Sequence, residues 1–451
     1  MIFNLNEILD DLDKTTVKFN GSLLWVPSLN KFICAFRAIK KPFSKFIENI
    51  PNYPYMWIDQ KFWYNNLNYI GLLLLNSDFS IVQNTFRKYF HTFKELDLIQ
   101  LESKGISYSG PEDPRLYFKS DGQPYMLYNT IIPDKILKNC KKQCVGMYEI
   151  KIKPGYFLRN CKSKELYDTS RRVVCLNVLD KLALNKKGNA HFKNLTPSNE
   201  IKRNVDYYID NFNNYKIIYK QEKKEENFIC KFDENMKLNN LNNIVLPENL
   251  KDIFRKDIIN NINTSLTSPE IRLEKDKEEF LGVAHVKVKF LYLLKNFEKL
   301  STNLKKFIII LKERIKNNFK QHNDFYFMLI YLRNIQGNII SYSKPFIPQS
   351  EDFANNVLYN VVFPCGLTRK GEDIIISYGE GDCLFNILNL KKDYIKKMLN
   401  LKKDYKEKIN KLKLKDFEIN YYKTNNIQKF DKLKNDLKKF GEKSKRLINI
   451  P

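Results

Sequence analysis

Residues 110–128 read GPEDPRLYFKSDGQPYMLY, and this stretch predicts a β-hairpin that begins with a rigid acidic turn. Pro111 and Pro114 restrict φ and push the residues before them towards extended geometry. Glu112 and Asp113 are therefore expected outside any helix, with Arg115 as a nearby cation. The residues that follow read as strand, turn and strand. The acid pair is interpreted either as catalytic or as a surface turn whose Asp caps backbone amides.

The hairpin is one of many short apolar runs that turn residues separate across residues 17–385. Such runs, without an alternating βαβ pattern, are typical of a sandwich, a barrel or a propeller. Their rhythm of strand, turn and strand favours repeated propeller blades, so the sequence predicts an all-β fold. The expected strands include 22–26, 31–37, 69–75, 125–128, 172–176, 215–219, 324–332, 356–363 and 373–378.

Two segments have helical spacing instead. Residues 293–320 are expected as a helical insertion between strands, and residues 386–451 as a basic helical segment. The latter repeats LNLKKDY at 388–394 and 399–405, an interval of about three helical turns. The strand-like and helical patterns together divide the chain into a lead-in at 1–16, a β-propeller domain at 17–390 and a Lys-rich helical tail at 391–451. The tail is interpreted as an oligomer or anionic-surface contact, or as an amphipathic helix packed on its own domain.

The net positive charge of the chain is large, and nearly half of it lies in the tail. The chain of 451 residues has a formal charge of +26, and residues 391–451 hold 20 Lys and Arg against 8 Asp and Glu. The rest of the excess is spread thinly, which indicates a compositional preference for Lys as much as a binding surface. The tail aromatics are too widely spaced to predict single-strand stacking, so we do not expect nucleic acid as a partner.

Neither a membrane span nor a metal site is predicted. No apolar run approaches the length of about 20 residues that crosses a bilayer, and the N-terminus lacks the pattern of a secretory signal. The eight cysteines are scattered, only Cys140 and Cys144 are close, and none of the four histidines lies near that pair. We therefore expect a soluble cytoplasmic protein with reduced cysteines and no bound metal.

Four further motifs accompany the acidic turn in a fixed order. They are Asn20-Gly21-Ser22 with the strand that ends at Arg37, Lys193-Asn194 with Pro197, Leu281-Gly282-Val283-Ala284-His285, and Ser377-Tyr378-Gly379-Glu380-Gly381-Asp382. Together with Gly-Pro-Glu-Asp-Pro-Arg at 110–115, they resemble the five-bladed β-propellers of glycoside hydrolase family 130. That family contains β-mannoside phosphorylases and hydrolases and has mannosyltransferase relatives. The resemblance covers about residues 17–390 and implies a five-bladed propeller that cleaves or transfers a β-mannosyl unit.

The resemblance also implies roles for individual residues. Asp113 would be the general acid of an inverting mechanism and would protonate the leaving oxygen directly or through a sugar hydroxyl. Such an acid needs a raised pKa, which burial or a like charge such as Glu112 can supply. The other residues implied in substrate binding are Asn20, Arg37, Glu112, Arg115, Lys193, His285 and Asp382. For His285 a hydrogen-bonded core histidine is an equal alternative.

The attacking group is left open by the sequence. Arg159 and Arg172 are candidates for binding phosphate or another anion, but neither lies in a recognisable motif, and Leu195 replaces a usual Trp after Lys193-Asn194. A phosphorylase needs cations for phosphate, whereas an inverting hydrolase needs a second carboxylate as base. We expect an oligosaccharide or sugar substrate and no cofactor, with inorganic phosphate or a nucleotide sugar as alternative co-substrates. The alternatives to cleavage are a mannosyltransferase that uses an activated donor and a non-catalytic sugar-binding propeller.

Overall fold

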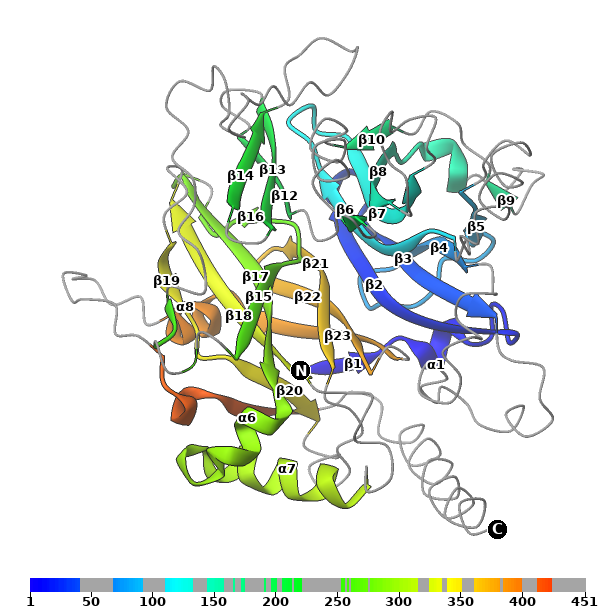
Figure 1. Ribbon diagram of the computed structural model, residues 1–451. Helices are drawn as coiled ribbons and strands as arrows, with labels where there is room; N and C mark the ends of the chain where they lie inside the picture. The colour runs from blue at the N-terminus through cyan, green and yellow to red at the C-terminus, as the bar shows by residue number, and fades with distance from the viewer. Residues whose placement is uncertain are drawn as a thin grey trace, which may run out of the picture.

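Five β-sheets make up most of the chain that the computed structural model describes (Figure 1), which confirms a mostly β fold. The described residues are 1–40, 68–91, 110–132, 144–157, 165–166, 172–174, 190–191, 196–200, 205–212, 215–220, 253–255, 258, 261–274, 276–314, 324–334, 339–350, 361–381, 384–399 and 412–423. Everything below concerns these residues.

The first two sheets use residues from the N-terminal half. One has the strand order β2 (Thr16–Val26), β3 (Lys31–Lys40), β4 (Asn68–Leu75), β5 (Arg87–Tyr89) and β9 (Glu165–Leu166). The other has the order β6 (Glu112–Phe118), β7 (Pro124–Ile132), β8 (Cys144–Lys151) and β10 (Arg172–Val174), with β11 (Ala190–His191) also on β8. The expected hairpin at 110–128 is therefore β6 and β7.

The other three sheets follow in sequence. A three-stranded sheet contains β12 (Thr196–Glu200), β13 (Val205–Phe212) and β14 (Tyr215–Lys220). A larger sheet has the order β15 (Ile262–Leu266), β17 (Glu279–Lys289), β18 (Asp324–Asn334), β20 (Phe346–Ser350) and β24 (Glu418–Tyr422), with β16 (Ile271–Arg272) on β17 and β19 (Ile339–Tyr342) on β18. The last sheet contains β21 (Val362–Lys370), β22 (Asp373–Glu380), β23 (Leu384–Lys391) and β1 (Ile2–Asn4).

Helices are few among the described residues. Where helical spacing predicts an insertion, α6 (Phe290–Lys295), the 3-10 turn Phe297–Lys299 and α7 (Thr302–Arg314) connect β17 to β18. The other helical segments are short: α1 (Asn6–Leu9), α8 (Lys392–Met398), and the 3-10 turns Pro27–Leu29, Pro154–Phe157 and Leu414–Asp416. No described helix has the length and apolar character needed to cross a membrane.

The last sheet is buried on both faces, which explains the continuous apolar run in β22. Ile374, Ile376 and Tyr378 belong to the core shared with the sheet of β17 and β18, whereas Ile375 belongs to the core shared with β2–β4. Successive side chains of a strand point to opposite faces, so alternate residues fill two different cores. The sheets of β2–β4, β21–β23 and β17–β18 are therefore stacked face to face.

Three edge strands from three sheets meet beside one another. β2, β6 and β21 each lie at the end of their sheet's strand order, and each contacts the other two. Two hydroxyls tie them together: Ser22 Oγ of β2 accepts from Leu116 N of β6 at 2.9 Å, and Thr368 Oγ1 of β21 accepts from Trp25 N of β2 at 3.0 Å. This junction holds the candidate site.

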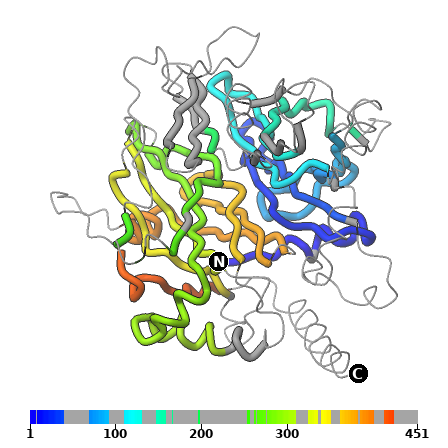
Figure 2. Tube along the Cα trace, viewed as in Figure 1, coloured from blue at the N-terminus to red at the C-terminus, as the bar shows by residue number. Residues whose placement is uncertain are grey.

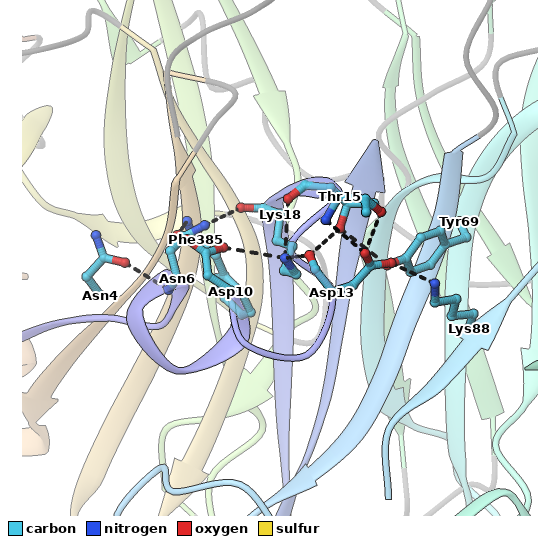
Figure 3. Close-up of polar contacts among 10 residues, drawn as sticks. Asn4, Asn6, Asp10, Asp13, Thr15, Lys18, Tyr69, Lys88 and Phe385 are labelled. Carbon is cyan, nitrogen blue, oxygen red and sulfur yellow. Dashed lines mark hydrogen bonds and ion pairs between the residues drawn. The ribbon is translucent and has the colours of Figure 1, made fainter. Parts of the chain in front are cut away.

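The N-terminal residues join the first sheet to the last. β1 pairs antiparallel with β23, and the trace in Figure 2 continues from there into β2. Asn6 bonds both sheets, because its Oδ1 accepts from Phe385 N at 2.6 Å and its Nδ2 donates to Lys18 O at 2.7 Å (Figure 3). Residues 1–16, expected as a lead-in, thus contain a strand of the last sheet.

Farther along the same segment, Asp13 is bound from two strands of the first sheet. Its Oδ2 accepts from Lys88 Nζ at 2.6 Å and from Tyr69 OH at 2.8 Å, and its Oδ1 accepts from Thr15 (Figure 3). We call residues 2–16 with these partners the N-terminal clasp.

The expected helical tail is wrong in two described places. Residues 386–391 lie in β23, because Ile387 and Leu388 are needed in the two cores of the last sheet. Residues 418–422 form β24, which pairs parallel with β20. Among the described residues of the tail, α8 is the only helix longer than a single turn, so it alone matches the helical expectation. The first LNLKKDY copy therefore starts in a strand and ends in a helix.

Candidate active site

Two β-bulges place an amide and a carboxylate beside each other. The register of β2 shifts between Phe19 and Ser22, and that of β6 shifts between Glu112 and Arg115. Asn20 and Asp113 lie in these bulges with positive φ values of 46° and 49°. Asn and Asp tolerate this left-handed conformation better than most residues, and bulges commonly re-aim side chains near functional sites.

The structure corrects one backbone expectation. Asp113 precedes Pro114 and was expected to be extended, but its φ is positive. The expectation that Glu112 and Asp113 lie outside a helix is confirmed, because β6 begins at Glu112. The bulge accounts for the difference, since it turns the chain locally to bring the Asp113 carboxylate to the neighbouring sheet.

Four of the predicted residues come together at this junction. Asn20 Nδ2 donates to Asp113 Oδ1 at 2.9 Å. Arg37 Nη2 donates to Glu112 Oε1 at 2.9 Å, and its Nη1 lies 3.5 Å from Asp113 Oδ1. The guanidinium therefore bridges the two carboxylates, and the Arg37 side chain also lies over the Phe19 ring.

The two carboxylate oxygens of Asp113 differ in their contacts. Oδ1 takes both contacts, from Asn20 and Arg37, whereas Oδ2 has no hydrogen-bond partner among the described residues. The Asp113 side chain keeps 13% of its surface exposed, at the edge of a buried cluster. Such a group is fixed in orientation and can still exchange a proton with a bound molecule.

Arg115 lies beneath this pair and is fully buried. Its Nη1 points at Met147 Sδ, 3.6 Å away. Burial lowers the pKa of Arg115, while the nearby Asp113 carboxylate opposes that shift. The guanidinium thus supplies a positive charge close to Asp113 from inside the protein.

His285 comes from the sheet of β17 and is also buried. Its ring lies between those of Tyr326 and Phe363. Burial holds the pKa of His285 well below its usual range, and the charges of Lys287 and Arg115 lower it further, so the imidazole is neutral at pH 7. Neither ring nitrogen has a hydrogen-bond partner among the described residues.

Gly379 of the late motif is required by the packing of Asn20. A Cβ added at Gly379 would lie 1.7 Å from Asn20 Oδ1. Any side chain there would displace the amide that binds Asp113. The Tyr-Gly pair therefore supports the acidic turn from a strand of the last sheet.

Glu380, the next residue, lies on the other face of that sheet. Because side chains alternate along β22, Glu380 shares the face of Tyr378, which packs in the core with β17 and β18. Asn386 Nδ2 donates to Glu380 Oε2 at 2.7 Å. Burial raises the pKa of Glu380 to about 7, and the side chains of Gln349 and Asn386 oppose the shift in part.

Several predicted residues are not placed. Asp382, Lys193 and Arg159 lie outside the described residues. Arg172 begins β10 opposite Glu149, and only its backbone is described. The structure therefore brings together Asn20, Arg37, Glu112, Asp113 and Arg115, and it brings His285 close to Arg115. Within the described residues, no group of three His, Cys, Asp or Glu side chains could hold a metal ion.

Solved structures of mannoside-processing enzymes are similar to this chain. One is a glycoside hydrolase of family GH130 that targets β-1,2 mannosidic linkages in Candida mannan, with 12% identity, a TM-score of 0.45 and coverage of 83% of this chain and 84% of that one. A β-1,2-mannobiose phosphorylase from Listeria innocua has 12% identity and a TM-score of 0.44, with coverage of 86% and 93%. A GDP-Man-dependent mannosyltransferase from Leishmania mexicana has 10% identity and a TM-score of 0.41, with coverage of 87% and 90%.

These similarities name the same group of enzymes that the sequence motifs resemble. No model of a protein family matches the sequence, and no curated protein matches it either.

Sequence reasoning missed three residues of the site. Ser22 bonds the backbone of β6, Met147 contacts Arg115, and Asn129 lies opposite Glu112 and Met147 in the strand register. Ser22 belongs to the Asn20-Gly21-Ser22 motif, but no role of its own was predicted for it. Asn129 and Met147 could be found only by counting across the hairpin, and the bulge at Asp113 shifts that count.

Proposed function

We propose that this protein is a carbohydrate-active enzyme that cleaves or transfers a β-mannosyl unit, with Asp113 as the general acid of an inverting mechanism. The observation that carries the proposal is the pair of facing bulges, in which Asn20 and Arg37 hold Oδ1 of Asp113. This arrangement occurs in the Gly-x-Glu-Asp-Pro-Arg turn that resembles the acid motif of glycoside hydrolase family 130. We take the five sheets as the five blades of the corresponding propeller.

The geometry suits proton donation to a leaving oxygen. Oδ1 is fixed by Asn20 and Arg37, so the proton would be carried by Oδ2, which has no other partner among the described residues. Oδ2 would protonate the glycosidic oxygen directly or through a sugar hydroxyl while the anomeric bond breaks. The attacking group approaches the opposite face of the sugar, which inverts the anomeric configuration.

The neighbouring charges would stabilise the reacting carboxyl group. Arg37 and Arg115 face Glu112 and Asp113, so these four residues together carry no net charge when all are ionised. Once Asp113 has given up its proton, both guanidinium groups stabilise the carboxylate that forms. Sugar hydroxyls would be bound by the remaining predicted residues, including Asp382.

The same charge balance bears on the attacking group. A neutral cluster favours water or an acceptor hydroxyl, because phosphate or a nucleotide needs additional positive charge. Lys193, Arg159 and Arg172 would have to supply that charge. An enzyme assay must therefore decide between hydrolysis, phosphorolysis and transfer from an activated mannosyl donor.

The test compares the parent protein with Asp113→Asn on β-mannosides, with and without inorganic phosphate, and with GDP-mannose plus an acceptor sugar. We expect Asp113→Asn to lower turnover roughly 10²–10⁴-fold, the usual contribution of a general acid. Asp121→Asn is the matched control, since Asp121 lies in the exposed turn of the same hairpin and, among the described residues, accepts hydrogen bonds only from Gln123 and Tyr125 of that hairpin. Full activity in Asp113→Asn would overturn the assignment. Sugar binding without turnover in the parent would show a non-catalytic sugar-binding protein instead.

A further inference from the structure

Asn129 is a buried amide whose hydrogen-bonding groups are unused. It lies in β7, its side chain has no exposed surface, and neither Nδ2 nor Oδ1 has a hydrogen-bond partner among the described residues. Buried side-chain amides in folded proteins almost always have partners, because an unpaired one opposes folding. A strand position that carries such a group therefore calls for a functional explanation.

The register places this amide beside the candidate site. Asn129 is the Cα partner of Glu112 on one side and of Met147 on the other. Directly paired residues of neighbouring strands point to the same face of a sheet, so the Asn129 and Met147 side chains share a face. Met147 is the residue that Arg115 contacts, and Arg115 in turn lies close to Asp113 and His285.

The chemistry of the amide limits what it could bind. Nδ2 offers two donors and Oδ1 offers an acceptor. An anion such as phosphate would use only the donors, and a metal ion would use only the oxygen, so each would leave half of the amide unpaired. Neighbouring hydroxyl groups of a sugar can both donate and accept, and they match the whole group.

We propose that Asn129 binds sugar hydroxyls beside Asp113 and so helps to determine which sugar the site accepts. The inference rests on the proposed function for the identity of the ligand. Neutral His285, which also has both ring nitrogens unpaired among the described residues, offers the same combination of one donor and one acceptor close to Arg115.

Asn129→Leu tests the inference, because Leu has the branching and heavy-atom count of Asn without its polar atoms. Thr130→Val is the matched control. Thr130 is the adjacent residue on the opposite face of β7, is buried, and also has an unpaired hydroxyl among the described residues. The melting temperature of each sugar-free protein is measured first, and then the affinity for mannose and methyl β-mannoside by calorimetry.

We expect Asn129→Leu to melt at or above the temperature of the parent protein, since it removes an unpaired polar group. We expect its sugar affinity to fall at least about tenfold, while Thr130→Val keeps the parent affinity. Asn129→Ala, which is smaller and cannot clash, repeats the affinity measurement if the Leu variant does not fold.

The outcomes separate the two proposals. A clear drop in the melting temperature of both Asn129 variants would show a structural amide and overturn the inference, whatever sugar binds. Unchanged sugar affinity in either variant would overturn it as well. If the parent binds neither sugar, the proposed function fails, and the melting temperatures then decide whether Asn129 is structural.

Discussion

Asn20 donates a hydrogen bond to Asp113 across 2.9 Å, and both residues have left-handed backbone conformations. They belong to different sheets, and each lies in a β-bulge. Each conformation is uncommon for a residue other than glycine, so it persists only because the surrounding structure holds both residues in place. This pair is the centre of the candidate site.

Replacing Asn20 with Gly should lower turnover while largely preserving the fold. Glycine keeps the positive φ without strain but removes the amide that holds Oδ1 of Asp113. A lost hydrogen bond to a charged group costs about 1.5–3 kcal/mol, so we expect a fall in kcat of roughly tenfold to a hundredfold. Asn30→Gly is the control, because Asn30 has a φ of 50° in the turn between β2 and β3, away from the site. Equal kcat values for both variants would contradict a role for the Asn20 amide.

Replacing Gly379 with Ala should disturb the same amide from the other side. The added methyl group would overlap Asn20 Oδ1, so the residue or the strand must shift. We expect a loss of about 1–3 kcal/mol in unfolding free energy, measured with urea, together with reduced turnover. Gly155→Ala, whose added Cβ would meet nothing within 4 Å, should be neutral in both measurements. A Gly379→Ala protein with parental stability and activity would refute the packing argument.

Glu380 should make the protein less stable as the pH rises from about 4.5 to about 7. Its pKa rises from 4.5 to about 7 on folding because of burial, so the folded state binds the proton more tightly than the unfolded state. Stability from this group is therefore complete at low pH and is lost as the pH rises, by up to about 3 kcal/mol. Glu380→Gln, which cannot ionise, should remove this slope in urea unfolding measured across the interval. An unaltered slope in the variant would assign the pH dependence to other groups.

Asp13 in the N-terminal clasp should have the opposite effect on pH dependence. Burial opposes its charged form, but hydrogen bonds from Lys88, Thr15 and Tyr69 prevail and hold the pKa of Asp13 below its usual value of 3.8. Its contribution to stability is present above pH 3.8 and disappears as the pH falls through the lowered pKa.

Asp13→Asn should accordingly lower the unfolding free energy at pH 7 by about 2 kcal/mol and flatten the acid limb of the stability curve. Asp11→Asn, at an exposed position two residues earlier, serves as the control. The prediction fails if thermal unfolding at pH 7 cannot distinguish the two variants.

Much of the fold and part of the site followed from local patterns. The apolar runs located β2, β3, β4, β7, β18 and β22, because each run is short and bounded by turn residues. The Glu-Asp-Pro-Arg turn located Asp113, because its residue types and order are unusual by themselves. Glycine and proline positions helped to locate turns wherever they constrain only the backbone next to them.

The remaining features depend on contacts between distant parts of the chain. The positive φ of Asp113 arises from a bulge that meets β2, which the local effect of Pro114 does not reveal. β24 is a strand because β20 offers it a free edge, although its surroundings are rich in Lys and favour a helix by composition. Asn129 could not be selected, because only the cross-strand register shows what lies beside it.

The pairing of β1 with β23 also constrains when the protein can become functional during its synthesis. Asn20 and Asp113 emerge from the ribosome early, but Gly379, which supports Asn20, and Phe385, which bonds the N-terminal clasp, are synthesised much later. Contacts between such distant positions form slowly, because a long loop must close before they contribute free energy. A nascent chain that stops before the last sheet would therefore expose the edges of β2 and β6, and truncated products should be insoluble and inactive.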